Sequence, residues 1–331
     1  MPDPRHEIAR RIRQGRSFVV AAHASPDGDA LGSTAAMGFV LEALGKTFSL
    51  LNDSPVPPQY GWLELPAPLL ETPPDDDYDL AIVLDCGDAP RLGNLQNALD
   101  PARMAVIDHH LGNPGFGAVN WVDPGRCATG EMVAFLAKDL GVPLTGPMAQ
   151  ALYTAMATDT GFFSFGGTTA ECMELGAEFI RGGLDVGLTG ALIKNQWTMN
   201  RLRLWSEVLG QIGLHHDGQV GVIRISQTML RRAGAGPEDC EGLINNALRI
   251  RGVTAAILAR ELPEGGVKFS LRSVGAVDVQ AVAASLGGGG HKNASGGTLA
   301  MSLEAAETAL TAAVGRAVAA ARGAGQAAAA K

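Results

Sequence analysis

The chain has 331 residues, of which 46% are hydrophobic and 18% are charged, a composition typical of a globular protein with room for two domains. Lys and Arg number 26 against 34 Asp and Glu, so the formal net charge is −8. This balance argues against a protein that tracks along nucleic acid, because such proteins need a basic stripe to release counterions. A short anionic substrate remains allowed, because bound divalent ions would supply positive charge locally.

The amino-terminal segment, residues 3–14, is charged and amphipathic and lacks the apolar core of a secretory signal. No stretch approaches the roughly 18 consecutive apolar residues of a membrane span, so we expect a cytoplasmic protein. The four cysteines form no CxxC pair, which favours a reducing compartment without disulfides. Cys86 lies beside a candidate ligand, and we expect a packed thiol there rather than a nucleophile.

The first strong signal is an apolar segment that leads directly into polar side chains. Residues 18–22 are apolar without alternation, which predicts a buried strand of a parallel sheet. His23, Asp27 and Asp29 follow in a stretch that contains Pro and Gly, which predicts a turn before the next helix. An alternative interpretation is an Asp-rich turn in which Asp29 caps that helix.

Three further apolar segments lead into acidic or histidine side chains. Two are predicted strands, residues 80–84 and 104–107, and one is a predicted helix, residues 150–158. The side chains that follow them are, in chain order, Asp85, Asp108, His109, His110 and Asp159. One such Asp is usually a cap, but four segments of this kind are not explained as caps. Carboxylates gathered this closely would repel one another and take up protons, so we predict a metal site.

Predicted strands and helices alternate through the first part of the chain. A further strand is expected at residues 47–51, and a proline-rich loop at 52–74. Helices are expected at residues 34–45, 92–99, 131–140, 147–158 and 169–181. A βαβα order predicts an α/β fold with a mainly parallel sheet flanked by helices.

The pattern changes beyond residue 190. Residues 191–209 predict a single connecting helix, in which we expect Trp197 and Trp205 to pack rather than to function. A hairpin at residues 212–226 turns at Asp217 and Gly218, and a helix at 242–249 and strands at 253–262 and 266–273 follow. We therefore predict a domain at 1–190, the helix at 191–209, a smaller α/β domain at 210–316 and an Ala-rich tail without regular structure at 317–331.

Taken together, these motifs resemble a known family. The segments HASPDGDA, VLDCGD, IDHH and ATDTGFFSF are similar to the four motifs of the DHH phosphoesterases, in order and at the usual spacing. GGGGHKNASGG, residues 287–297, is similar to the glycine-rich signature of the DHHA1 domain. The motifs span residues 18–297, and the chain most resembles the bacterial nano-RNase (oligoribonuclease) and 3′-phosphoadenosine-5′-phosphate (pAp) phosphatase type.

The resemblance implies two divalent metal ions. The ligands of the first would be His23, Asp27 and Asp85, and those of the second would be Asp29, Asp85, His109 and Asp159. Asp85 would bridge the two ions, which would activate a bridging hydroxide. Mixed imidazole and carboxylate ligands suit Mn²⁺ best, with Mg²⁺ or Co²⁺ as alternatives.

The resemblance also assigns roles outside the ligand set. His110 would contact the scissile phosphate or the leaving oxygen, and Asp108 would orient a ligating histidine. Ser25 and Ser164 depart from the family pattern, which often has Asn and a basic residue there, and this would weaken a phosphate contact.

In the second domain the substrate would be held by five residues: Arg272, Gly288, Gly289, Gly290 and His291. The glycines would let backbone N–H groups approach an anion, and Arg272 would bind phosphate in a bidentate manner. The alternative interpretation is a glycine loop kept for tight packing, with Arg272 on a solvated strand face.

The implied activity is hydrolysis of very short RNA to 5′-mononucleotides, and of pAp to AMP, in a cleft between the domains. Four alternatives stay open: a cyclic- or linear-dinucleotide phosphodiesterase (c-di-AMP, pApA or pGpG), a RecJ-type exonuclease, a manganese pyrophosphatase, and an inactive nucleotide-sensing module. The expected partners are short RNA or small nucleotides, with no long nucleic-acid track and no membrane. A homodimer is an open option.

Overall fold

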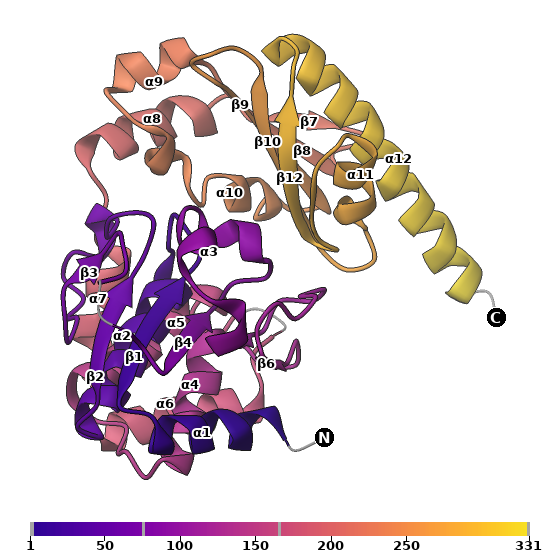
Figure 1. Ribbon diagram of the computed structural model, residues 1–331. Helices are drawn as coiled ribbons and strands as arrows, with labels where there is room; N and C mark the ends of the chain where they lie inside the picture. The colour runs from indigo at the N-terminus through magenta and orange to yellow at the C-terminus, as the bar shows by residue number, and fades with distance from the viewer. Residues whose placement is uncertain (1–2, 75–76, 165–166, 330–331) are drawn as a thin grey trace. The chain divides into compact units, whose positions relative to one another are not determined.

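The computed structural model describes residues 3–74, 77–164 and 167–329. The chain divides into two compact units, Met1–Gln196 and Trp197–Lys331, each built around one six-stranded sheet (Figure 1). The predicted α/β class is confirmed for both units. Among the described residues, no helix is long and apolar enough to cross a membrane.

The sheet of the first unit is entirely parallel, with the strand order β3-β2-β1-β4-β5-β6. Its strands are β1 (Ser17–Ala22), β2 (Thr47–Leu51), β3 (Leu69–Leu70), β4 (Leu80–Leu84), β5 (Met104–Asp108) and β6 (Val119–Val122). Its helices are α1 (Pro4–Gln14), α2 (Gly28–Ala43), α3 (Leu95–Ala98), α4 (Thr129–Asp139), α5 (Gly146–Asp159), α6 (Ala170–Arg181) and α7 (Val186–Lys194), with short 3₁₀ turns η1 (Pro58–Tyr60), η2 (Ala89–Leu92) and η3 (Pro101–Arg103).

Both faces of this sheet are covered, which explains why the central strands are apolar without alternation. Phe18 and Val20 of β1 pack into the core that contains α2, α4 and α5. Val19 and Ala21 of the same strand pack on the opposite face with Leu92 and its neighbours. Every side chain of such a strand is therefore inside the protein.

The strand order reverses between β1 and β4. The chain runs outward from β1 through β2 to β3, and then returns to place β4, β5 and β6 on the other side. In open parallel sheets, ligands bind outside the carboxyl ends of the strands at this reversal. The predicted ligands after β1, β4 and β5 lie at those ends.

Close helix packing brings α2 and α5 together at the same edge. A side chain at Gly32 would place its Cβ 2.5 Å from the carbonyl oxygen of Ala151, and one at Gly28 would lie 2.4 Å from Thr158 Oγ1. Only glycine fits at these contacts. The start of α2 and the end of α5, which carry Asp29 and Asp159, are therefore held against each other.

The second unit has a mixed sheet with the order β11-β12-β10-β9-β8-β7, in which β8 and β9 are parallel and the other pairs antiparallel. Its strands are β7 (Gly213–His215), β8 (Val220–Ile225), β9 (Ala255–Glu261), β10 (Val267–Ser273), β11 (Gly289–His291) and β12 (Ala294–Leu299). Its helices are α8 (Met199–Leu209), α9 (Gln227–Ala233), the 3₁₀ turn η4 (Pro237–Cys240), α10 (Ile244–Leu248), α11 (Val279–Ser285) and α12 (Leu303–Ala329). α11 and α12 share one core with the sheet, and α8, α9 and α10 share the other.

Three local predictions for this region were wrong. Residues 191–209 form two helices, because α7 ends at Lys194 and Thr198 caps α8 by accepting a hydrogen bond from Arg201 N. Helix α12 continues to Ala329 through the segment expected to be an irregular tail, since alanine is the best helix former. Part of the expected glycine loop is the edge strand β11, paired with β12.

Candidate metal centre

The six predicted ligands come from five element ends that meet at one edge of the first sheet. They are His23 after β1, Asp27 at the N-cap of α2, Asp29 in its first turn, Asp85 after β4, His109 after β5 and Asp159 at the end of α5. Three groups of side chains have ligand atoms within 4.8 Å of one another: His23, Asp27 and Asp85; Asp29, His109 and Asp159; and Asp85, His109 and His110. The first group contains the three ligands predicted for one ion, and the second contains those predicted for the other except Asp85. The assignment of ligands to ions stays a prediction.

The orientation of His23 directs a nitrogen lone pair at carboxylates. His23 Nδ1 lies 2.9 Å from the carbonyl oxygen of Ala24, which can only accept, so Nδ1 carries the hydrogen. Nε2 of the neutral ring then presents its lone pair, and this buried atom has no hydrogen-bond partner among the residues that the structure describes. It lies 3.5 Å from Asp85 Oδ2 and 3.9 Å from Asp27 Oδ1. Acceptors that face one another in this way need a proton or a metal ion between them.

His109 repeats this arrangement on the other side of Asp85. Its Nδ1 lies 3.3 Å from the carbonyl oxygen of Arg126, and its Nε2 lies 3.6 Å from one carboxylate oxygen each of Asp29, Asp85 and Asp159. The three separations of 3.6 Å from Nε2 are too long for hydrogen bonds. They suit nitrogen and oxygen ligands that each lie about 2.0–2.2 Å from a shared ion.

Backbone groups hold two of the carboxylates in place. Asp29 accepts hydrogen bonds from the N–H groups of Thr129 (2.7 Å) and Gly130 (2.9 Å), the first residues of α4. These are N–H groups that a helix cannot satisfy internally, and they favour a negative partner. Asp85 has a left-handed backbone (φ 53°) and accepts a hydrogen bond from Thr129 Oγ1 at 3.2 Å.

Burial and repulsion between carboxylates raise the pKa of two acidic groups, Asp29 and Asp159. The pKa of Asp29 is raised well above its usual value by burial and then by Asp85 and Asp159. Burial also raises the pKa of Asp159 to about 6, with Asp85 and Asp27 adding to the effect against His109. Burial lowers the pKa of His23, but the Asp85 carboxylate outweighs it and the net shift is upward. A bound cation would instead stabilise the ionised carboxylates and so lower their pKa.

His110 is bound to Asp108 at the edge of the ligand cluster, and its Nδ1 also lies 3.5 Å from Asp85 Oδ1. Its Nδ1 donates to Asp108 Oδ1 at 2.7 Å, and Asn113 donates to Asp108 Oδ2 at 2.6 Å. Burial lowers the pKa of His110, but the hydrogen bond to Asp108 raises it, and the net shift is upward. Because Nδ1 carries the hydrogen that Asp108 accepts, Nε2 of the neutral ring is an acceptor, and Nη1 of Arg91 donates to it at 3.5 Å.

Sequence reasoning missed Arg91, Asn113 and Thr129. Arg91 and Asn113 follow the DCGD and DHH segments within a few residues, but nothing in their spacing distinguishes them from ordinary loop residues. Thr129 reaches the site from 44 positions beyond Asp85 and had no local signal. The expectation for Cys86 is supported, because burial raises the pKa of its thiol to about 12.

Two of the five predicted substrate residues, Arg272 and His291, lie in one row of the second sheet. Arg272 is opposite Ala294 on the neighbouring strand, and Ala294 is opposite His291 on the next. Directly opposed residues have side chains on the same face, so Arg272 and His291 share a face. Arg272 is partly buried, which lowers its pKa, and His291 is exposed.

Tight packing accounts for two of the three predicted anion-binding glycines. A Cβ at Gly288 would lie 2.2 Å from the carbonyl oxygen of Gly296, and one at Gly290 would lie 2.6 Å from that of Ala294. A Cβ at Gly289 would meet nothing within 4 Å. Their anion-binding role stays a prediction, and Gly289 is the position where packing does not require glycine.

Comparison with known proteins places this geometry in a family. The model of the DHH family, N-terminal domain, matches residues 17–156, and the DHHA1 domain matches residues 218–320. A Thermus thermophilus protein named bifunctional oligoribonuclease and PAP phosphatase NrnA is 33% identical over 90% of each chain.

The chain belongs to the DHH family. It is therefore a phosphoesterase, a hydrolase that cleaves phosphate esters, and the resemblance identified from its motifs is confirmed. The protein of the same name from Bacillus subtilis is 25% identical over 88% of this chain and 92% of its own length. An exopolyphosphatase-related protein from Bacteroides fragilis superposes with a TM-score of 0.89 at 26% identity, over 96% of this chain and 97% of the other.

Proposed function

We propose that this DHH phosphoesterase hydrolyses very short RNA to 5′-mononucleotides, and pAp to AMP, with two divalent metal ions. The observation that carries the proposal is the buried Nε2 of His23, which has no hydrogen-bond partner and faces the carboxylates of Asp27 and Asp85. A protein fold retains a buried unpaired acceptor beside carboxylates only where something else pairs with it.

The donor set fits two ions that share Asp85. His23, Asp27 and Asp85 would hold one ion, and Asp29, Asp85, His109 and Asp159 would hold the other. Nitrogen and oxygen donors without thiolates favour Mn²⁺, Mg²⁺ or Co²⁺ over structural zinc. When bound, two such ions neutralise phosphate oxygens and supply an activated water at neutral pH.

The protein's own groups would handle the rest of the phosphate. Asp108 fixes the His110 ring through Nδ1, which directs Nε2 toward Arg91 and the position proposed for the substrate phosphate. Arg91 Nη1 donates to that Nε2 at 3.5 Å, and a phosphate oxygen would accept from Arg91, and from Nε2 once that ring is protonated. We assign His110 to the scissile phosphate or leaving oxygen, and Arg91 to a non-bridging oxygen.

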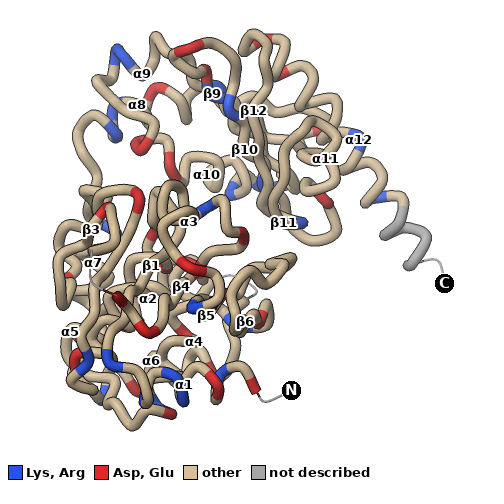
Figure 2. The backbone as a smooth tube through the Cα atoms, viewed as in Figure 1, with Lys and Arg blue, Asp and Glu red and all other residues tan. Residues whose placement is uncertain are grey.

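Substrate choice is assigned to the second unit. Arg272 and His291 share a sheet face, and Gly289 leaves backbone exposed beside them. This row suits the terminal phosphate of a nucleotide. In the view of Figure 2, Lys and Arg residues of the described chain are scattered among acidic residues rather than gathered in a stripe. The relatives named oligoribonuclease and PAP phosphatase agree with a short substrate.

A turnover panel tests this proposal. The full chain with Mn²⁺ would be given an RNA dinucleotide, a 24-nucleotide RNA, pAp, c-di-AMP and pyrophosphate, with Asp85→Asn as the inactive control. We expect kcat/KM to be highest for the dinucleotide, and AMP to be released from pAp. Preference for c-di-AMP or pyrophosphate would replace the assigned substrate, and no turnover of any member with tight binding would indicate a sensing module.

A further inference from the structure

The second unit contains an aromatic hollow that the proposed chemistry does not use. Trp197, Leu202, Trp205 and Leu209 line its apolar part, and the cavity measures about 490 Å³. This volume lies within the roughly 300–1,000 Å³ range of small-molecule sites. Trp205 is buried as expected, whereas Trp197 packs on it and is 47% exposed, so that the prediction that Trp197 only packs stays untested.

The exposed ring of Trp197 is held in a defined position. It packs on Trp205 with the ring centroids 4.3 Å apart, and Trp205 is anchored by donating from Nε1 to the carbonyl oxygen of Asp239 at 2.8 Å. The guanidinium of Arg201 lies 5.2 Å from the centroid of each ring. Because these contacts already order the ring of Trp197, less side-chain entropy would be lost when a ligand binds to it.

The polar part of the hollow suits an uncharged heterocycle with an attached anion. Asn245 of α10 supplies an amide donor and acceptor, and Arg249 supplies a positive charge, while the amide of Asn246 is bonded within α10 and to Arg249. Asn245 is exposed, and the residues that line the hollow include no carboxylate. The site therefore attracts phosphate without repelling it.

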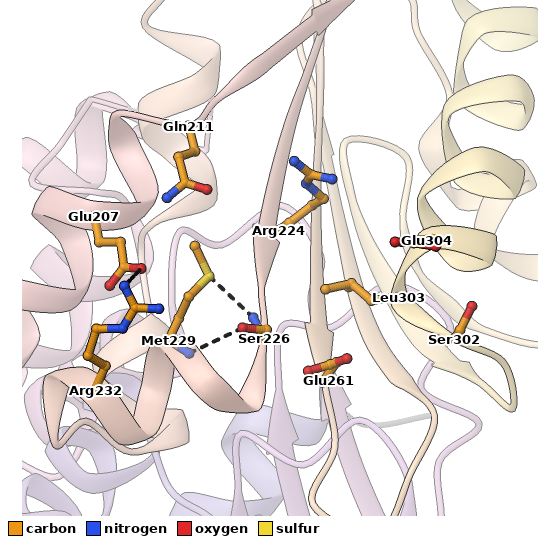
Figure 3. Close-up of a pocket in the computed structure, with 10 residues that line it drawn as sticks. All are labelled: Glu207, Gln211, Arg224, Ser226, Met229, Arg232, Glu261, Ser302, Leu303 and Glu304. Carbon is orange, nitrogen blue, oxygen red and sulfur yellow. Dashed lines mark hydrogen bonds and ion pairs between the residues drawn. The ribbon is translucent and has the colours of Figure 1, made fainter.

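A second hollow in the same unit provides a contrast (Figure 3). It is lined by Arg224, Arg232 and three glutamates, including Glu207 and Glu261. Its charges are satisfied within the protein: Arg232 pairs with Glu207 at 3.2 Å, and Glu261 accepts from Gln227 N at 2.8 Å. This second hollow carries no aromatic ring, and Arg232 serves as a matched control position.

We propose that Trp197 is a stacking platform for a nucleobase of the RNA substrate, with Asn245 contacting the base edge and Arg249 a flanking phosphate. Every base has a π-face, so such a platform binds without sequence preference. The inference rests on the proposed function, because it names the part of the substrate that the second unit recognises. It adds a base-binding site to the predicted phosphate row of Arg272 and His291.

Fluorescence titration of the full chain without divalent ions tests this proposal, because binding there does not depend on the metal centre. Triadenylate is expected to quench tryptophan emission and to bind more tightly than an abasic chain of the same length. Trp197→Ala should remove most of the quenching and raise the Kd for triadenylate about fivefold or more, with the abasic chain unaffected. Trp197→Phe should bind more tightly than Trp197→Ala, and the control Arg232→Ala should match wild type.

A variant on the exposed face guards against a folding defect. Asn245→Ala should raise the Kd for triadenylate about two- to fivefold and leave the abasic chain unchanged. Equal binding of the two chains by wild type, or equal losses for both in Trp197→Ala, would overturn the proposal. So would a change from dimer to monomer in Trp197→Ala, which would make the hollow an interface between copies. Hydrolysis of a chromogenic phosphodiester with Mn²⁺, measured in parallel, tests the metal chemistry separately.

Discussion

Asp85 is the side chain whose replacement should affect the chemistry most. It is 2% exposed, and its two oxygens lie 3.5–3.6 Å from nitrogens of His23, His109 and His110. Asp85→Asn keeps the size and one carbonyl oxygen but removes the negative charge. The hydrogen bond from Thr129 Oγ1 at 3.2 Å can still be accepted, so the local fold should persist.

The magnitude follows from the number of partners that share Asp85. Both proposed ions would lose a charged ligand in one substitution, which should cost at least about 4 kcal/mol of transition-state stabilisation. This corresponds to a fall in kcat/KM of about 10³-fold or more. The metal-free variant should unfold at the same temperature as wild type or a higher one, because one of the carboxylates that repel Asp29 is neutral.

The assay is hydrolysis of a chromogenic phosphodiester with Mn²⁺, combined with calorimetric counting of bound Mn²⁺. The stoichiometry should fall below that of wild type. Asp88→Asn is the matched control, because Asp88 is the exposed second aspartate of the same DCGD segment and belongs to none of the three ligand groups found among the described residues. More than about a tenth of wild-type activity in Asp85→Asn would remove Asp85 from the centre of the mechanism.

Three further predictions concern pH, positioning and substrate length. The pKa of Asp159 is raised to about 6, so the metal-free fold should lose stability as the pH rises from about 4 to above 6. The gain in melting temperature on adding Mn²⁺ should grow over the same pH window, and a gain that is constant with pH would contradict this prediction. Asn113→Ala removes a donor to Asp108 and should lower kcat about tenfold with little change in KM, whereas a purely structural role would lower the melting temperature instead. Steady-state kinetics should show kcat/KM falling roughly tenfold or more between a two- to four-nucleotide RNA and a 24-nucleotide one, because the chain has a net charge of −8; equal efficiency would indicate a channel for long RNA.

Much of the first unit was predictable because its signals are local. Each central strand is an uninterrupted apolar run, and its end is marked by the polar residues that follow, so β1, β4 and β5 were located to within a residue. The candidate ligands could be predicted for the same reason, because side chains that follow parallel strands gather at one edge of the sheet. The hairpin of β7 and β8 was found from its Asp-Gly turn.

Other features depend on contacts between residues distant in the chain. The break between α7 and α8 depends on capping by Thr198, while apolar periodicity continued through it. The pairing of β11 with β12 turned a glycine run into a strand edge, because Gly288 and Gly290 lie against backbone that only glycine can approach. Trp205 and Trp197 lie eight positions apart. Trp205 is buried because it packs into the core formed with α8, α9 and α10, whereas Trp197 lies outside that core and is exposed.

The sequence thus determined which residue types stand at the strand ends, and hence the class of chemistry. The tertiary structure alone decided how they are aimed. The ring of His23 is oriented by the carbonyl of Ala24, and the carboxylate of Asp29 by the first N–H groups of α4, a hundred residues away. Orientation of this kind cannot be found in a motif, because it depends on hydrogen-bond partners and close packing that exist only once distant elements have come together.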